Sequence, residues 1–157
     1  MQNTKSPTLQ NLEAAFAGES MAHIKYLWFA RQCRKAGDEG TAKVFEDTAA
    51  QEMLHAFGHA ELLFADETMT PAKCLQYAIE GETHEYTEMY PKFRHEAMIE
   101  GNTAAVAEID AQITESKDHA EMFRAVLKKA AKRFAALAKV EEKHAKHYQA
   151  QKDAIAA

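Results

Sequence analysis

Apolar residues recur every three or four positions along almost the whole chain, and runs of β-branched residues are missing. This spacing matches the period of an α-helix, in which residues three and four apart share one face. It predicts helices over residues 8–35, 41–65, 71–99, 102–129 and 132–151. The sequence therefore predicts an all-α fold.

Glycine and proline mark most of the expected helix ends. Gly37 and Gly101 follow the first and third periodic segments, where glycine commonly ends a helix. Pro71 follows Thr70 at the start of the third segment, and proline is tolerated in a first helical turn because the missing N–H has no helical partner there. Pro91 lies inside the same segment, so we expect a kink in this helix.

The last fifty residues carry no such marks. Asn102 is a suitable N-cap for the fourth helix, and no glycine or proline follows it. One helix over residues 102–151 would be about 75 Å long at about 1.5 Å per residue. We therefore expect a break near residues 128–132 and a separate fifth helix after it.

Composition limits the class of protein further. A chain of 157 residues with 46% hydrophobic residues, 6 Gly and 3 Pro fits one helical domain over residues 1–157. A net charge of −5 argues against nucleic acid or an anionic membrane as partner, and no stretch is long enough to span a bilayer. Cys33 and Cys74 have no CxxC spacing and are most simply core residues, so a reducing cytoplasm is expected.

Acidic residues interrupt the apolar stripes at their centres. Glu19 lies on the stripe of the first helix, Glu52 on that of the second, and Glu82 and Glu85 on that of the third, within GETHEYTEMYP. A buried carboxylate is costly unless it has a positive partner, and Lys and Arg are nearly absent from these stripes. The pattern therefore predicts metal cations between the helices.

The spacing of the polar residues supports a metal site. Glu52 and His55 lie one turn apart on one helical face, as do Glu82 and Glu85. Helical bundles that hold two irons take one Glu from each of two helices and a Glu-x-x-His from each of the other two. Oxygen ligands with a minority of imidazole favour iron or manganese over zinc or copper.

Structural interpretations compete with the metal site. About one Glu-x-x-His should occur by chance in a chain with this many His and acidic residues, so a single copy means little. Glu88, His84 and His95 are expected at the surface, whereas His23 and His59 lie on the inward stripes but more simply have structural roles. A purely structural bundle is the alternative, and the acids on the apolar stripes count against it.

Three segments, FAGESMAHIKYLWFA, EMLHAFGHAELLF and LQYAIEGETHEYTEMYP, resemble helices of the rubrerythrin family of ferritin-like diiron proteins. The resemblance covers residues 8–130 in motif order and spacing. It implies a ferritin-like four-helix bundle, here with an additional C-terminal fifth helix, and a centre of two iron ions, with manganese or a mixed pair as alternatives. It further implies that Glu82 bridges the irons, that Glu85 moves with oxidation state, and that Tyr26 and Tyr90 orient carboxylates. The remaining ligands that it implies in the first two helices are Glu19, Glu52 and His55.

The chain departs from the family pattern in two places. It has no rubredoxin-like segment with paired CxxC motifs, so it resembles the shortened members and is expected to take electrons from a separate donor such as rubredoxin or a reductase. The expected Glu-x-x-His of the fourth helix reads Ser116-Lys117-Asp118-His119. Either Glu115 with His119, or the intact pair Glu141 and His144 in the fifth helix, could complete the site, and both remain open.

The connection between the second and third helices is short. In a ferritin-like bundle these helices run parallel, so their link must span a helix of about 35 Å. The roughly six linking residues reach about 20 Å when extended. We therefore expect a domain-swapped homodimer in which helices 1 and 2 of one chain pack with helices 3 and 4 of another.

The expected activity follows from the family that the chain resembles. It is that of a non-haem diiron peroxidase, which reduces hydrogen peroxide to water in oxidative-stress defence, with Glu85, Tyr26 and Tyr90 acting around the metals. A ferroxidase that oxidises Fe(II) with oxygen or peroxide is the alternative enzyme. A metal-binding or sensing module without turnover is the alternative outside the enzyme class.

Overall fold

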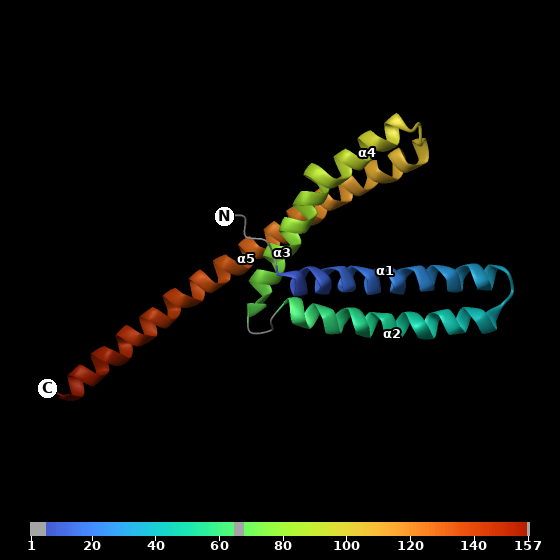
Figure 1. Cartoon of the computed structure of the whole chain (residues 1–157). Coiled ribbons are helices and arrows are strands. Elements are labelled where there is room, and N and C mark those ends of the chain that lie inside the picture. Colours follow the sequence, from blue (N-terminus) through green and yellow to red (C-terminus); the bar gives the residue numbers. More distant parts are fainter. Residues whose placement is uncertain (1–5, 65–67, 157) are drawn as a thin grey trace. The chain divides into compact units, whose positions relative to one another are not determined.

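The computed structural model describes residues 6–64 and 68–156, and every regular element in these ranges is helical. The all-α prediction is therefore confirmed. In chain order (Figure 1) the elements are α1 (Pro7–Lys35), α2 (Glu39–Leu63), α3 (Pro71–His84), the π-helical turn η2 (Glu85–Met89), α4 (Tyr90–Ile99) and α5 (Thr103–Ala156). The predicted end of the second helix at residue 65 lies outside the described residues.

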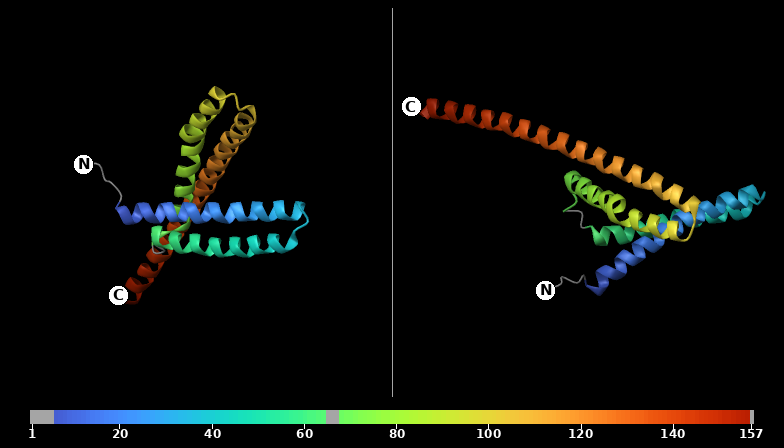
Figure 2. Two further views of the ribbon diagram at one scale, coloured as in Figure 1. Left: turned by 45° about the vertical axis from the view of Figure 1, so that its right-hand side comes forward. Right: turned by 90° about the horizontal axis from the view of Figure 1, so that it is seen from above.

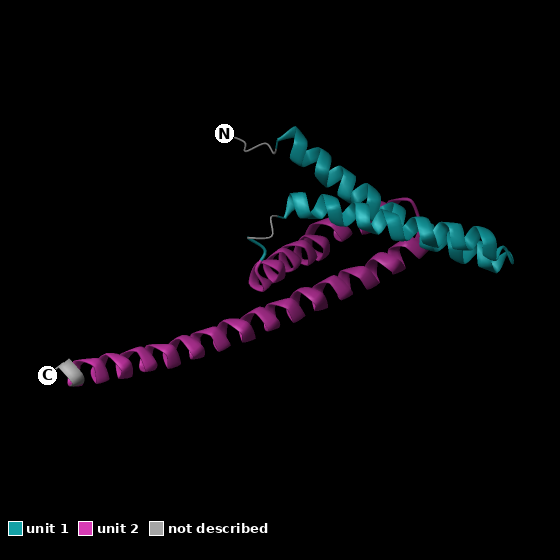
Figure 3. Cartoon of the chain, turned by 90° about the horizontal axis from the view of Figure 1, so that it is seen from below, with its two compact units in different colours: residues 1–69 teal, residues 70–157 magenta. Residues whose placement is uncertain are grey.

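The chain forms two compact units, Met1–Met69 and Thr70–Ala157, which Figure 3 shows in different colours. Helices α1 and α2 make up the first unit, and α3, η2, α4 and α5 make up the second. A single domain over residues 1–157 stays a prediction. None of the described helices has a stretch both long and apolar enough to cross a membrane.

The first unit is an antiparallel pair of helices joined by a tight turn (Figure 2). Gly37 has a φ of 82°, which favours glycine, and it follows α1 as the sequence predicts. Ala42, Ala49 and Ala56 are buried at every seventh residue of α2. Alanine at these positions lets the backbones of α1 and α2 approach closely, which brings opposing side chains within reach of one another.

In the second unit, α3, η2 and α4 follow one another and pack against α5. The predicted N-cap Asn102 is present, because its side chain accepts a hydrogen bond from the Ala105 amide. Thr70 caps α3 in the same way, by accepting a hydrogen bond from the Lys73 amide. The irregularity expected at Pro91 takes the form of a π-helical turn that ends at Met89. The Tyr90 amide there donates to the Glu85 carbonyl, five residues back.

The predicted break near residues 128–132 is wrong, because α5 continues as one helix of 54 residues from Thr103 to Ala156. The predicted fifth helix at 132–151 is its C-terminal part. The segment KKAAKRFAALAKV consists largely of strong helix formers and has no glycine or proline. The helix does not break at 128–132, despite its length, because nothing in the local sequence ends it.

The C-terminal part of α5 buries little. All side chains from 131 to 154 are exposed, including Phe134, Leu137 and Tyr148 at 70%, 55% and 71%. Upstream, the same helix face carries the buried residues Ser116 and Ala120. Packing of the described residues in α5 is therefore concentrated before residue 131.

A chain shortened to residues 1–130 should keep its thermal unfolding midpoint within about 3 °C of the full chain, because the removed side chains are exposed. Helicity per residue should also be retained. Circular dichroism at several temperatures measures both quantities. A drop of about 10 °C or more would show that this helix end is packed against something in solution.

Candidate metal centre

Three potential metal ligands meet in the first unit. Glu19 lies near the middle of α1, and Glu52 and His55 lie one turn apart on α2. One ligand atom from each comes within 4.8 Å of the others. His55 Nδ1 lies 2.8 Å from Glu52 Oε2, and the Glu52 side chain is only 16% exposed. The structure thus brings together the three residues that the sequence predicts as ligands from the first two helices.

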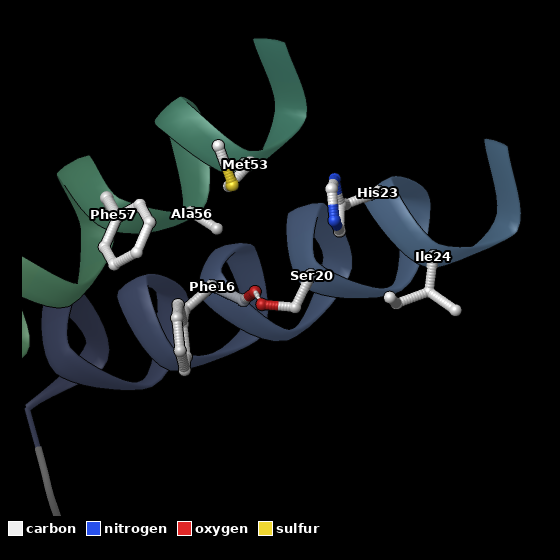
Figure 4. Close-up of a pocket in the computed structure, with 7 residues that line it drawn as sticks. All are labelled: Phe16, Ser20, His23, Ile24, Met53, Ala56 and Phe57. Atoms are coloured by element: carbon white, nitrogen blue, oxygen red, sulfur yellow. Dashed lines mark hydrogen bonds between the residues drawn. The ribbon is translucent and has the colours of Figure 1, made fainter. Parts of the chain in front are cut away.

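Apolar and aromatic side chains surround this end of the helix pair. An open hollow of about 310 Å³ lies between α1 and α2, and Phe16, Met53 and Phe57 line it with Ser20 (Figure 4). Ser20 and Met53 directly follow Glu19 and Glu52 in the sequence. The hollow therefore lies close along both helices to the two carboxylates, and its lining is mainly apolar.

Tyr26 and His23, both on α1, make contacts other than to the three ligands. The Tyr26 ring packs against Phe45, with ring centroids 5.9 Å apart. The His23 ring uses Nδ1 to donate to the carbonyl of buried Ala49, at 2.7 Å. These contacts tie α1 to α2. His23 thus has a structural partner, and a role for Tyr26 in orienting carboxylates stays a prediction.

A second set of potential ligands lies in the other unit. Glu82 on α3 and His119 on α5 approach to 3.3 Å between Oε1 and Nδ1. The other carboxylate oxygen, Glu82 Oε2, is buried and has no hydrogen-bond partner among the described residues. A buried carboxylate oxygen without a donor is costly, and a bound cation would remove that cost.

Glu85 begins the π-helical turn and faces α5. Its Oε2 accepts a hydrogen bond from Ser116 Oγ at 2.9 Å, and Ser116 is only 4% exposed. Two residues before Glu85, Thr83 accepts a hydrogen bond from Arg124 at 2.7 Å. Two polar contacts therefore fix this stretch of the helix against α5. Isolated π-helical turns within helices frequently occur at functional sites.

Tyr90 follows the π-helical turn and lies in the electrostatic field of the acidic residues. Burial raises the pKa of the Tyr90 phenol, and the negative charges of Glu85, Glu82 and Glu108 raise it further. The phenol therefore keeps its proton at neutral pH and remains able to donate a hydrogen bond to a carboxylate.

The residues predicted to complete the site differ in their surroundings. Glu115 is exposed, whereas Ser116 beside it is buried and takes the contact to Glu85. Glu141 and His144 are 67% and 59% exposed and lie 4.0 Å apart, far along α5 from His119. Of these candidates, His119 contacts Glu82, a predicted ligand from another helix. Roles for the other three stay predictions.

Several other predictions concern surface positions. Glu88 and His84 are exposed and lie 3.5 Å apart, and His95 is exposed, as expected. Cys74 is also exposed, so its prediction as a core residue is wrong. It lies in the first turn of α3, where few side chains of the described residues are covered.

The donor set suits a hard transition metal. Carboxylate oxygens predominate and imidazole is the minority ligand in both units, as iron or manganese prefers. Glu82 Oε2 also supplies the buried, unpartnered atom that a metal site requires. The residues therefore fit the metal predicted from the sequence.

Sequence reasoning missed Ser116 as the partner of Glu85. One signal was available, because Ser116 precedes His119 by three residues, the same offset that separates Glu52 from His55. The sequence alone could not predict that Ser116 is buried or that its hydroxyl donates to Glu85 at the start of η2.

Replacing Glu82 with methionine should leave the metal-free protein as stable as the parent or more stable by about 1 kcal/mol, because a buried unpartnered oxygen is removed. The same change should reduce the rise in unfolding midpoint on adding Fe(II) or Co(II). Chemical denaturation with and without metal measures both effects. Glu88→Met, at an exposed position in the same stretch, is the control and should change neither. If Glu82→Met kept the full metal-induced rise, Glu82 would not be a ligand.

Comparison with known proteins identifies the family. The sequence model described as Rubrerythrin matches residues 10–127. Nigerythrin from Nitratidesulfovibrio vulgaris is 40% identical over 132 residues, which cover 75% of this chain and 64% of nigerythrin. A putative rubrerythrin from Methanocaldococcus jannaschii is 34% identical over 141 residues, covering 77% of this chain and 69% of that protein.

A solved structure of nigerythrin in a mixed-valence state aligns with a TM-score of 0.41 at 33% identity, covering 83% of this chain and 70% of that one. The sequence match spans most of the chain and includes the acidic segments of α1, α2, α3 and α5. The chain therefore belongs to the rubrerythrin family of ferritin-like, iron-binding helical proteins.

Proposed function

We propose that this protein is a non-haem diiron peroxidase that reduces hydrogen peroxide to water with electrons from a separate donor. The observation that carries the proposal is that one ligand atom each of Glu19, Glu52 and His55 lies within 4.8 Å of the others. Family membership supports a role in oxidative-stress defence. The specific reaction is our inference from the ligand chemistry.

The proposed centre draws on both units. Three ligands in the first unit are too few for two metal ions, and Glu82, Glu85 and His119 in the second unit are of the same chemical types. Together they provide four carboxylates and two imidazoles. Four negative charges balance two divalent cations, so the ligand set would be neutral overall once both ions are bound. Iron is the proposed metal, with manganese or a mixed pair as the alternative.

A bound pair of ferrous ions would supply the two electrons that, with two protons, reduce hydrogen peroxide to two water molecules. The chain's own residues position the reaction. Glu19, Glu52 and Glu82 would hold the metals, and Glu85 would shift with their oxidation state. The Tyr90 phenol can donate a hydrogen bond that orients a neighbouring carboxylate, and the rise of its pKa favours this protonated form further. Tyr26 would orient a carboxylate in the first unit.

We propose rubredoxin or a reductase as the electron donor. Cys33 and Cys74 are free thiols, which suits a reducing compartment such as the cytoplasm. The substrate is hydrogen peroxide in the main proposal and oxygen in the ferroxidase alternative.

We further propose a domain-swapped homodimer. At 25 residues, α2 is about 37 Å long. The roughly six residues that link α2 to α3 reach only about 20 Å when extended, so they cannot run back along α2. Part of that link, residues 65–67, lies outside the described residues. Large apolar side chains such as Met21, Trp28 and Leu54 are 54–65% exposed in the first unit, which suits helices that are covered by a second chain.

The diferrous protein should react with hydrogen peroxide at least about tenfold faster than with oxygen, if peroxide reduction is its activity. Anaerobic rapid mixing followed by absorption spectroscopy measures both rates. A faster reaction with oxygen would favour the ferroxidase. Stoichiometric iron with no peroxide consumption in the presence of reductant would favour a module without turnover.

Domain swapping can be tested by mixing two damaged chains. One chain carries Glu52→Ala with His55→Ala, and the other carries Glu82→Ala. In a swapped heterodimer, the intact first unit of one chain meets the intact second unit of the other, so one full metal site is restored. In an unswapped pair, every site keeps a damaged half.

Metal content after co-refolding measures the outcome, with each variant alone as control. The parent should have twice the chain mass of 17.6 kDa by light scattering. A monomer with full metal occupancy would overturn the dimer.

A further inference from the structure

Ser116 occupies an unusual position for a serine in the middle of a long helix. It is buried to 4% exposure, next to Ala120 at 0% on the same face of α5. The hydroxyls of Thr114 on α5 and Ser20 on α1 each donate to a backbone carbonyl of their own helix, four residues back. The Ser116 hydroxyl does not. It donates instead to Glu85 Oε2, 31 residues away in sequence, at 2.9 Å.

The chain contains an internal comparison for this position. On α2, Glu52 precedes His55 by three residues, and the two side chains approach to 2.8 Å. On α5, Ser116 precedes His119 by three residues, and His119 contacts Glu82. Each pair thus consists of a histidine, which could bind a metal, and a second polar residue one helical turn before it. The difference is that α2 supplies a carboxylate at this position and α5 supplies a neutral hydroxyl.

A backbone hydrogen bond also holds Glu85. The π-helical turn begins at Glu85, and its carbonyl accepts the Tyr90 amide across five residues. The side chain is then fixed by Ser116 through one carboxylate oxygen, which leaves the other oxygen free of that bond. Among the potential ligands of this unit, Glu85 is therefore anchored by both its backbone and its side chain.

We propose that Ser116 is a positioning residue that orients Glu85 for metal binding. The expected effect on metal binding rests on the proposed metal function, whereas the Ser116–Glu85 hydrogen bond does not depend on it. A hydroxyl donor stabilises the Glu85 carboxylate without adding charge. A carboxylate at position 116 would face Glu85 and repel it in the absence of metal.

The expected consequence is a metal affinity that depends on the Ser116 hydroxyl. Glu85 has one carboxylate oxygen that the Ser116 bond does not use, and that bond holds the carboxylate in one orientation. Without the hydroxyl, Glu85 would have to be ordered by the metal itself, so binding should be weaker. Residues that orient a ligand commonly change metal affinity by about ten- to a hundredfold when replaced.

The first experiment titrates the full-length, metal-free protein with Co(II) by calorimetry. Ser116→Ala should weaken the site that contains Glu85 by about tenfold, because Glu85 loses its orienting donor. Ser116→Thr should restore most of that loss, since it returns the hydroxyl. Ser116→Glu should tighten the same site by about tenfold through the added charge. Thr114→Ala, which removes an exposed hydroxyl on the same helix, is the matched control and should have no effect.

The second experiment needs no metal. A double-mutant cycle of Ser116→Ala and Glu85→Ala compares the denaturation midpoints of the metal-free proteins. The two changes should be non-additive, because each removes the same contact. Ser116→Glu should also lower the metal-free midpoint, and metal should raise it more than in the parent.

The outcomes separate the two proposals. An additive cycle, or Co(II) affinities that are the same in the parent, Ser116→Ala and Ser116→Glu, would overturn the role of Ser116. A parent protein that binds no Co(II) while the cycle remains non-additive would overturn the proposed metal function but retain the contact. Weakened binding in Ser116→Ala with rescue by Ser116→Thr supports both.

Discussion

A carboxylate that leaves water must find a cation or hydrogen-bond donors, and this requirement governs the central parts of both units. Glu52 is largely covered and pairs with His55, while one oxygen of Glu82 is buried without a donor. No protein group among the described residues donates a hydrogen bond to that oxygen. Metal ions would supply the missing positive charge, which explains why helices with apolar seams carry acids at their centres.

The packing of each unit places these acids. Alanines at every seventh residue of α2 keep α1 close enough for Glu19 to meet Glu52 and His55. In the second unit, the π-helical turn and Ser116 position Glu85, and Arg124 holds the preceding turn through Thr83. The first unit therefore uses small alanines to bring its charged side chains together, whereas the second uses a neutral hydroxyl and Arg124.

The two ligand sets each contain two carboxylates and one imidazole, but they differ in the residue one turn before the histidine. At this offset α2 carries Glu52 and α5 carries Ser116. Ser116 donates a hydrogen bond to Glu85, so at this position α5 contributes an orienting hydroxyl where α2 contributes a carboxylate.

The sequence by itself determined the helices, their caps and the nearness of Glu52 to His55, because these depend on periodicity and on contacts within one turn. It did not determine the continuity of α5, since the helix formers from Lys128 onward give no local stop and length alone is a weak guide. Only the tertiary structure decided that Glu82 meets His119 and that Ser116, rather than Glu115, faces Glu85. These contacts join residues more than thirty positions apart, and they depend on how α3 and η2 are rotated against α5, which no local pattern encodes.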